Sequence, residues 1–335
     1  MVWNAARDFA GRFRQHGGPK VAINLKPRRS PWGGGNQFVE QFERRLSAEG
    51  YSVVFRLDED VRCILLIDPR AESPTAFKMA AIRSFKERRP DVPIIHRVNE
   101  CDQRKGTTGV DKVLGEANAI VDFTVFISEW LRDYFVERWF DPSRPHMVIG
   151  NGADPAIFFP GGETDEARSP FRLVTHHWSD NWMKGFKVYR EVDRMIADGK
   201  LPDVALSVIG RWPSDIRWRS AKLHGPTRGE KLAELLRSHH AYLTASLWEP
   251  CGMHHIEGAQ CGLPLIYHKD GGGIVEFGKR YGIGFTDNVR GAILEAKDNY
   301  DMLRSKVLAD PPSGARMVEQ YLSVVKRLLP LNLCG

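Results

Sequence analysis

Short runs of apolar residues alternate with amphipathic stretches along the chain, which is the pattern of parallel strands joined by helices. In the first half, the runs that predict strands lie at residues 21–25, 51–55, 63–67, 92–96 and 123–127. In the second half, they lie at residues 171–176, 204–209, 241–244 and 265–267. Helices are predicted between the strands, including one with Phe38, Phe42 and Leu46 at helical spacing and others at residues 129–139 and 313–329. We therefore predict an α/β protein built from two successive units.

Turn-forming residues mark the boundary expected between the two units. Residues 148–155 and 160–162 are rich in Gly, Asn, Asp and Pro, and we place the boundary between them. This gives a first domain over residues 1–155, a second over residues 156–311 and a C-terminal segment over residues 312–335. A length of 335 residues fits two domains of ordinary size.

Composition narrows the class of protein. A hydrophobic fraction of 42% and a charged fraction of 27% favour a packed core and argue against disorder. No apolar run approaches the ~20 residues that a membrane helix needs, and the N-terminus lacks the apolar stretch of a signal peptide. The five cysteines show neither zinc-type spacing nor an even count, so we expect no disulfide framework. A reducing, cytoplasmic setting fits these features.

The net charge of +6 raises the question of an anionic partner. The N-terminal third contributes basic residues that include Arg7, Arg12, Arg14, Lys20, Lys26, Arg28 and Arg29. They would suit peripheral contact with anionic lipid at the inner membrane face, or an anionic acceptor. We favour a third interpretation, in which these residues form a basic surface in contact with solvent. Nucleic acid is not predicted as a partner, because the basic residues are spread out and no nucleic-acid motif is present.

The most informative stretch is residues 246–265, where Glu249 and Glu257 are separated by seven residues. A carboxylate accepts paired hydrogen bonds from neighbouring hydroxyls. Glycine lets a helix N-terminus approach a phosphate closely, and the free backbone amides there favour negative charge. The amides expected to seat a phosphate are those of Gly252, Met253 and His254. The stretch therefore offers a sugar contact, a phosphate seat and a ribose contact, which together suit a nucleotide sugar.

This arrangement resembles the donor signature of retaining GT-B glycosyltransferases, in particular glycosyltransferase family 4. The resemblance rests on the two carboxylates, on Gly262-Leu263-Pro264 after the second, and on Gly271-Gly272-Gly273-Ile274-Val275-Glu276 further on. It implies a GT-B fold, in which two Rossmann-like domains face each other across a cleft and the last helix returns to the first domain. It also implies a cytoplasmic enzyme of polysaccharide biosynthesis.

The reaction that the resemblance implies is sugar transfer from a nucleotide-diphosphate sugar, with UDP- or GDP-sugars as the expected donors. The acceptor would be a hydroxyl of a glycan, a lipid-linked molecule or a small molecule. The anomeric configuration would be retained. No metal and no other cofactor would be required.

The resemblance also assigns roles to residues of the second domain. Glu249 would contact the hydroxyls of the donor sugar, and Glu257 the ribose. Lys184, followed by a glycine, matches the lysine that neutralises the diphosphate, for which a compact charge is suited. The family usually has an arginine five residues earlier, but this chain has Ser179, and Arg211 is a candidate replacement.

In the first domain, the Gly-rich loop after the first strand would approach the donor phosphate or the acceptor. Asn99 stands where the family commonly has a histidine that touches the donor sugar. Candidates for contact with the acceptor are Arg97, Glu100 and Arg104. In the second domain, His177 lies at a strand end and is expected to line the site. The candidate loop residues are Gly33, Gly34 and Gly35.

Several other patterns have a simpler interpretation. The acidic turn at residues 58–60 fits the metal motif of GT-A glycosyltransferases but lacks the rest of that pattern. Residues 273–280 nearly match a P-loop, yet Arg280 stands where a hydroxyl must hold Mg²⁺. The paired histidines lack the spacing of a zinc site, so no metal site is predicted. Ser128 is interpreted as a helix cap, and Cys251 and Cys261 as core thiols.

Three alternatives stay open. The first is a nucleotide-sugar epimerase or hydrolase on the same scaffold. The second is a dinucleotide-dependent dehydrogenase, against which stands the lack of a Gly-x-Gly-x-x-Gly fingerprint after the first strand. The third is a non-catalytic GT-B protein that binds a nucleotide or glycan, which the departures at Ser179 and Asn99 would allow.

Overall fold

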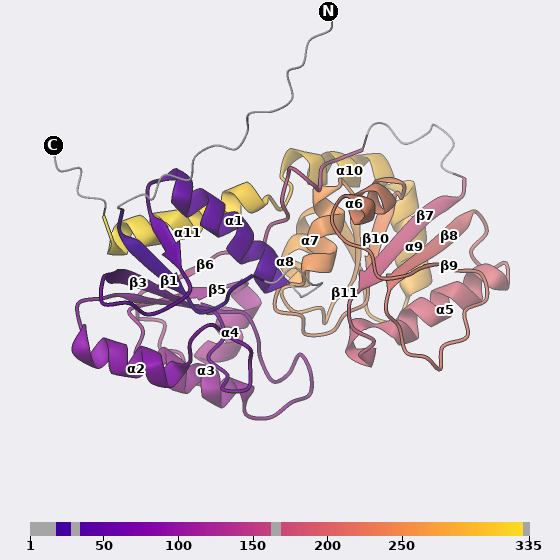
Figure 1. Ribbon diagram of the computed structural model, residues 1–335. Coiled ribbons are helices and arrows are strands. Elements are labelled where there is room, and N and C mark those ends of the chain that lie inside the picture. Colours follow the sequence, from indigo (N-terminus) through magenta and orange to yellow (C-terminus); the bar gives the residue numbers. More distant parts are fainter. Residues whose placement is uncertain (1–17, 28–33, 162–168, 331–335) are drawn as a thin grey trace, which may run out of the picture.

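The computed structural model describes residues 18–27, 34–161 and 169–330, which form two lobes side by side (Figure 1). Within these residues, each lobe is built on a six-stranded parallel sheet covered by helices. The strand orders are β2-β1-β3-β4-β5-β6 in the first lobe and β12-β11-β10-β7-β8-β9 in the second. Both sheets are doubly wound, because the chain runs outward from the middle in both directions. The predicted α/β GT-B architecture of two Rossmann-like domains is thus confirmed.

The first domain alternates strands and helices in the predicted order. Its strands are β1 (Lys20–Ile23), β2 (Ser52–Val54), β3 (Val61–Leu66), β4 (Ile94–Val98), β5 (Phe123–Phe126) and β6 (His146–Val148). Its helices are α1 (Gly34–Ala48), α2 (Met79–Arg88), α3 (Val110–Asn118) and α4 (Glu129–Val136).

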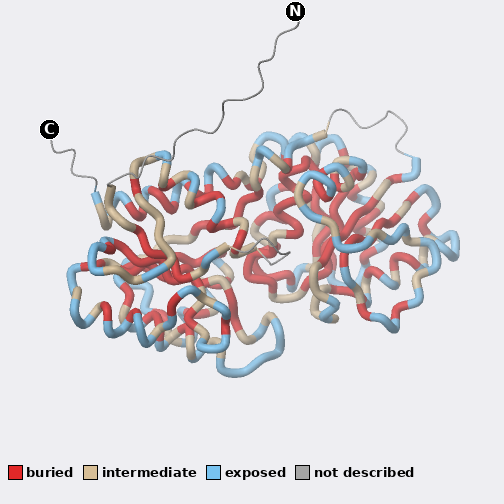
Figure 2. The backbone as a smooth tube through the Cα atoms, in the orientation of Figure 1, coloured by how far each residue is buried: buried red, intermediate tan, exposed pale blue. Residues whose placement is uncertain are grey.

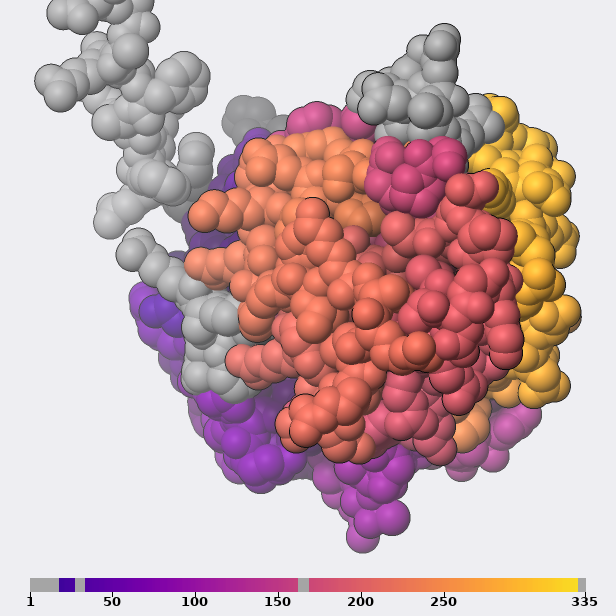
Figure 3. Space-filling model, turned by 90° about the vertical axis from the view of Figure 1, so that its right-hand side faces the viewer, coloured from indigo at the N-terminus to yellow at the C-terminus, as the bar shows by residue number. Residues whose placement is uncertain are grey.

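The second domain repeats this plan with more helices. Its strands are β7 (Phe171–His177), β8 (Val204–Gly210), β9 (Lys222–His224), β10 (Ala241–Thr244), β11 (Leu265–His268) and β12 (Gly282–Phe285). A short 3₁₀ helix, η1 (Trp182–Lys184), precedes the helices α5 (Phe186–Ala197), α6 (Glu230–Arg237), α7 (Met253–Gln260), α8 (Ile274–Tyr281), α9 (Val289–Asp298) and α10 (Tyr300–Ala309). Figure 3 views the molecule with this domain in front and the first domain behind it.

The last helix, α11 (Gly314–Leu328), lies against α1 of the first domain (Figure 1). Its apolar face is buried there, and the rings of Phe38 and Tyr321 are 4.6 Å apart between centroids. An ion pair of 2.7 Å between Arg45 and Glu319 joins the two helices at the surface. The chain thus begins and ends its described part in the same lobe.

Three strands of the structure have no counterpart among the predicted apolar runs: β6, β9 and β12. All three lie at an edge of a sheet, where a strand has one neighbour instead of two. None is more than four residues long, and β6 and β9 contain no buried residue. Edge strands need no continuous apolar run, because one side of each contacts solvent.

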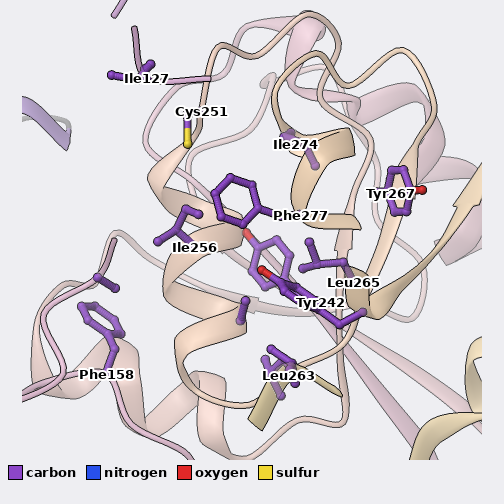
Figure 4. Close-up of a cluster of buried hydrophobic side chains, with 14 of the residues drawn as sticks. Ile127, Phe158, Tyr242, Cys251, Ile256, Leu263, Leu265, Tyr267, Ile274 and Phe277 are labelled. Atoms are coloured by element: carbon purple, nitrogen blue, oxygen red, sulfur yellow. The ribbon is translucent and has the colours of Figure 1, made fainter. Parts of the chain in front are cut away.

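The two lobes share an apolar contact where they meet. A single cluster of buried side chains includes Ile127 of the first domain together with Cys251, Ile274 and Phe277 of the second (Figure 4). Figure 2 shows buried backbone in both sheets and in the region between the lobes. The domains therefore meet through packed side chains as well as through the polar groups of the cleft described next.

Candidate functional site

A cleft of about 420 Å³ lies between the lobes, at the carboxyl ends of strands from both sheets. Ligands of open parallel sheets bind at this end of the strands. The first-domain wall includes Leu25, Gly34, Gly35, Asn36, Ile67, Asp68, Arg70, Arg97, Asn99, Glu100, Arg104, Lys105, Ile127 and Asn151. The second-domain wall includes His177, Trp178, Ser179, Lys184, Glu249, Cys251, Gly252, Met253 and His254. Most of the site residues predicted from the sequence are therefore brought together.

The backbone of Glu249 is fixed by the glycine run that follows β11. Its amide donates to the carbonyl of Gly271 over 3.2 Å, and its carbonyl accepts from the amide of Gly273 over 2.9 Å. Gly272 has a φ of +64°, and a Cβ there would lie 2.8 Å from the carbonyl oxygen of Glu249. A Cβ on Gly273 would meet the carbonyl of Pro250 at 2.0 Å. Glycines are needed here because the backbone of this run lies so close to the backbone of Glu249 and Pro250. This packing explains the glycine run, and no P-loop function is needed to account for it.

The carboxylate of Glu249 is only 3% exposed and contacts two cations. One oxygen pairs with the Lys184 ammonium, and the other lies 3.0 Å from Nε of Arg104 in the first domain. Burial alone would raise the pKa of Glu249, but the charges of Arg104 and Lys184 outweigh it and lower the pKa to about 2. Glu249 is therefore ionised at neutral pH and can accept hydrogen bonds from hydroxyls.

Lys184 reaches the cleft because the chain turns sharply after β7. Asn181 caps η1 by accepting from the amide of Met183 over 2.8 Å. Gly185 follows with a φ of +91°, and a Cβ there would lie 2.4 Å from Ala245 at the end of β10. Burial lowers the pKa of Lys184, while the Glu249 carboxylate opposes that shift. The turn therefore places a cation beside Glu249 where the resemblance expects the diphosphate.

The N-termini of two helices meet in the cleft. α7 begins at Met253, directly after Gly252, and α1 begins at Gly34. A Cβ on Gly34 would lie 2.4 Å from Cγ of Met253, so only glycine permits this approach of the two domains. Helix N-termini carry unpaired amides and partial positive charge. The arrangement suits an anionic group between them.

Glu257, the second carboxylate of the motif, has a different setting. It is 2% exposed and is not among the residues that line the cleft. One oxygen accepts from Nε2 of Gln37 in α1 over 2.9 Å, and the other lies 2.7 Å from Nε2 of His176. A ribose would have to replace Gln37 to reach this carboxylate, and the ribose contact stays a prediction.

The first-domain wall is formed by the residues that follow β4. Asn99 and Glu100 lie in the cleft as expected. Glu100 binds Arg104 at 2.9 Å and Lys105 at 2.8 Å through the same oxygen. Arg97 is 2% exposed and makes no ion pair within the described residues; it donates to the side-chain oxygen of Asn151 over 2.7 Å.

Two histidines complete the second-domain wall. His177 bonds through Nε2 to the hydroxyls of Thr175 and Tyr189, both 3.0 Å away. Nε2 of His254 lies 3.1 Å from the hydroxyl of Thr244. Burial holds the pKa of both imidazoles well below the ordinary value, and nearby Lys184 lowers both further. Both rings are therefore neutral and suit hydrogen bonding rather than charge pairing.

Some predicted positions are not brought into the cleft. Arg211 is exposed after β8 and does not line it, so the prediction that it replaces the missing cation gains no support. Ser179 lines the cleft without charge, and its hydroxyl accepts from the amide of Asn181 over 3.2 Å. Gly33 lies outside the described residues.

The other patterns have the structural roles expected of them. Asp58 and Asp60 in the acidic turn pair with Arg56 and Lys20. Ser128 caps α4 by accepting from the amide of Leu131 over 3.1 Å. The thiols noted in the sequence, Cys251 and Cys261, are buried, and burial raises the pKa of each to about 12.

Sequence reasoning did not find the contacts that join the domains. Gln37 reaches Glu257, and Arg104 reaches Glu249. Glu276 in α8 accepts from the backbone amides of Glu129 and Trp130 at the start of α4, over 3.2 and 2.7 Å. Gln37 carried no signal in the sequence, because a polar residue on a helix is ordinarily a solvated one. The i,i+4 spacing of Glu100 and Arg104 was a signal, but it did not indicate a partner in the other domain.

Two features are absent from the described part of the chain. No group of three or more His, Cys, Asp or Glu within that part of the chain could hold a metal ion. None of the helices described there is both long and apolar enough to span a membrane.

Part of the sequence resembles a known protein family. Residues 218–320, from just before β9 into α11, match the family model of glycosyl transferases group 1. This range includes Glu249 and the helix α7, which carries Glu257. A comparison with curated protein sequences gave no match.

Solved structures resemble the chain over nearly its whole length. Sucrose-phosphate synthase (tll1590) from Thermosynechococcus elongatus has 15% identity and a TM-score of 0.65, with 93% of this chain and 99% of that one covered. Anabaena Alr3699/HepE in complex with UDP has 13% identity and a TM-score of 0.67, with 92% and 100% covered. A glycosyltransferase from Rickettsia africae ESF-5 has 14% identity and a TM-score of 0.63, with 94% and 100% covered.

At these identities the likeness to solved structures shows the fold, which is GT-B. The family match to part of the second domain adds independent support for a glycosyltransferase. The region of the match and the wall that carries Glu249 and Lys184 overlap, so sequence and geometry indicate the same site.

Proposed function

We propose that the chain is a retaining glycosyltransferase of the family 4 type, which transfers a sugar from a nucleotide-diphosphate sugar to an acceptor hydroxyl. One observation carries the proposal: a buried, ionised Glu249 lies beside Lys184 and the N-terminus of α7 in a cleft between two Rossmann-like domains. A carboxylate binds sugar hydroxyls, whereas a cation and helix amides bind phosphate. These are the two halves of a nucleotide-diphosphate sugar.

The donor would lie mainly on the second domain. Its sugar would bond to Glu249, and its diphosphate would lie between Lys184 and the amides of Gly252, Met253 and His254. UDP- and GDP-sugars are the expected donors, and the neighbours solved with UDP and with UDP-glucose support a nucleotide sugar. Glu257 would contact the ribose after Gln37 moves aside.

The protein's own charges would replace a metal at the diphosphate. Lys184 and the positive end of α7 stabilise the negative charge that develops as the leaving group departs. The acceptor would bind on the first-domain wall, near Asn99, Arg97 and Glu100. Its hydroxyl oxygen bonds to the anomeric carbon from the face that the phosphate leaves, and the departing phosphate oxygen takes the hydroxyl proton. This route retains the configuration.

The acceptor class is proposed more broadly: a glycan, a lipid-linked molecule or a small molecule with a free hydroxyl. Burial lowers the pKa of His177 and of His254, which makes both imidazoles weak bases, and the scheme assigns neither of them a proton transfer. Contact with the inner membrane face through basic first-domain residues is the corresponding proposal for a lipid-linked acceptor.

Calorimetric titration of the purified protein with UDP, GDP, ADP and NAD tests the donor site, first with EDTA and then with Mg²⁺. We expect tight binding of one nucleoside diphosphate that is unchanged by Mg²⁺. Binding of NAD alone would instead indicate a dehydrogenase. Binding of no nucleotide would indicate a non-catalytic scaffold.

Product analysis with the donor so identified tests the reaction. Transfer to an added acceptor, with the anomeric configuration of the new bond read by NMR, is the expected result. Release of free sugar or of an epimer without any acceptor would indicate a hydrolase or an epimerase. An inverted linkage would contradict the proposed mechanism while leaving the donor site intact.

A further inference from the structure

The two walls of the cleft carry different amounts of positive charge. Among the described residues that line the second-domain wall, the charged side chains are Lys184 and Glu249, which pair with each other and cancel. The first-domain wall carries Arg70, Arg97, Arg104 and Lys105 against Asp68 and Glu100. A leaving nucleoside diphosphate carries more negative charge than Lys184 alone can balance. Besides Lys184 and the N-terminus of α7, the cations that line the cleft belong to the first domain.

Of these first-domain cations, Arg104 is the one that contacts the second-domain carboxylate. Its Nε lies 3.0 Å from Glu249, and its Nη1 lies 2.9 Å from Glu100. Arg70 is instead paired with Asp68 at 2.7 Å. Lys105 contacts Glu100 but not Glu249. Arg104 and Lys184 therefore hold the two oxygens of one carboxylate from opposite domains.

The loop that carries Arg104 is held in place by its own hydrogen bonds. The Asp102 carboxylate accepts from three backbone amides at residues 109–111 and from the hydroxyl of Thr107, over 2.8 to 3.0 Å. The Asp111 carboxylate accepts in return from the amide of Asp102 over 2.8 Å. Arg104 itself is only 25% exposed. A guanidinium fixed in this way is preorganised for a ligand at the same place.

We propose that Arg104 is a catalytic residue supplied across the domain interface. Without donor it pairs with Glu249; when the donor's hydroxyls bond to Glu249, the guanidinium turns to the diphosphate beside Lys184. As the bond from the anomeric carbon to the phosphate oxygen breaks, that oxygen keeps the electron pair, and Arg104 stabilises its charge. Arginine stays protonated throughout and transfers no proton. The inference rests on the glycosyl transfer proposed above.

A comparison of nucleoside diphosphate and monophosphate tests this role by binding alone. The variant is Arg104→Gln, and the matched control is Lys112→Gln, an exposed lysine on the neighbouring helix α3. We expect Arg104→Gln to weaken binding of the diphosphate that the wild type selects by roughly tenfold or more, because a charge-assisted pair is lost. Binding of the corresponding monophosphate should change less than about twofold, because it lacks the leaving phosphate. The control should match the wild type on both ligands.

Kinetics add a second readout. We expect kcat of Arg104→Gln to fall by roughly 10²-fold, the usual effect of losing one transition-state charge contact. Arg104→Lys should recover part of the loss, and added guanidinium ion should restore part of the activity of Arg104→Ala. Added urea at the same concentration should restore none.

The failure of this inference differs from the failure of the proposed function. If the wild type binds no nucleoside diphosphate, glycosyl transfer itself is wrong. If the wild type binds one, but Arg104→Gln binds it equally well or better, Arg104 only holds Glu249 and the inference is overturned. Should Arg104→Gln misfold because Glu100 loses one of its two partners, the double variant Arg104→Gln/Glu100→Gln removes the charge of Glu100, and the same ratio of affinities decides.

Discussion

Glu249 and Glu257 are both glutamates of one motif and both almost fully buried, yet their surroundings differ. Glu249 lies before α7 between two cations, and it lines the cleft. Glu257 lies within α7 and bonds to an amide and an imidazole beneath the cleft surface. A buried carboxylate with two cations is held as an anion, whereas one with Gln37 and His176 is held by hydrogen-bond geometry. Of the two glutamates, the one that lines the cleft is thus the one that is paired with cations.

Removing the charge at the first of these positions should have the largest effect. We expect Glu249→Ala and Lys184→Ala each to lose most transfer activity, roughly 10²- to 10³-fold in kcat, because both contacts would be made in the transition state. Both variants should still fold, since the cleft is open to water on one side. Steady-state kinetics and circular dichroism measure the two effects. Wild-type rates in both purified variants would contradict the assignment of these residues to the site. The control is Glu234→Gln, on the exposed side of α6.

The second carboxylate should be less sensitive. Glu257→Gln keeps an oxygen that can accept from Gln37 and removes only the charge. We expect KM for the donor to rise by roughly tenfold with kcat changed much less, because a ribose contact is made equally in the ground and transition states. Steady-state kinetics at varied donor concentration measure this split. A loss of kcat as large as that of Glu249→Ala would show that Glu257, like Glu249, makes its contact in the transition state.

Acid should weaken the contribution that Glu249 makes to stability. The pKa of Glu249 is lowered from 4.5 to about 2, so its ionised form stabilises the folded state above pH 4.5, and that stabilisation disappears as the pH falls towards 2. We expect the stability difference between wild type and Glu249→Gln to shrink through this range. Urea unfolding at several pH values measures it. A difference that stayed constant from pH 6 to 3 would mean that the two cations do not hold the carboxylate in solution.

The smallest expected effect is at the neutral partner of Glu257. Gln37→Ala removes one hydrogen bond from a residue that has a second partner in His176, and should cost about 1 kcal/mol of stability. If a ribose replaces Gln37, the same variant should bind the nucleoside diphosphate as well as the wild type or somewhat more tightly. Thermal unfolding and calorimetry measure the two quantities. Weaker binding would indicate that Gln37 holds the ligand itself.

The sequence predicts the parts of this molecule that are determined locally. The buried central strands are continuous apolar runs, and Lys184 and Glu249 stand in short motifs, so both could be found without a structure. The edge strands β6, β9 and β12 could not, because their residues are half-exposed and their pairing is decided by a neighbour. The partners of the two carboxylates could not either. Gln37 and Glu257 are 220 residues apart in the chain, and no local pattern relates them.

The glycine run at residues 271–273 could be found in the sequence, but its role could not be predicted from it. Its composition is compatible with a phosphate loop, a turn or a close backbone contact. Only the packing distinguishes them: a Cβ on Gly273 would meet both Pro250 and Ser128, which belong to different domains. The sequence therefore identified the important residues here but not the reason for them.

If the chain transfers sugars as proposed, the contact between Glu276 and the first turn of α4 limits how the first domain can change between related chains. Glu276 belongs to the second domain, yet it satisfies backbone amides of a helix in the first, next to the cap that Ser128 provides. A different first domain, with another acceptor pocket, would fit this second domain only under one condition. The helix that corresponds to α4 would have to begin with backbone amides that are free to donate to Glu276. A domain exchange that takes α4 and α8 from one parent would keep this contact. New acceptor pockets would then arise by changes in the loops of the first domain, while the contact between α4 and α8 stayed the same.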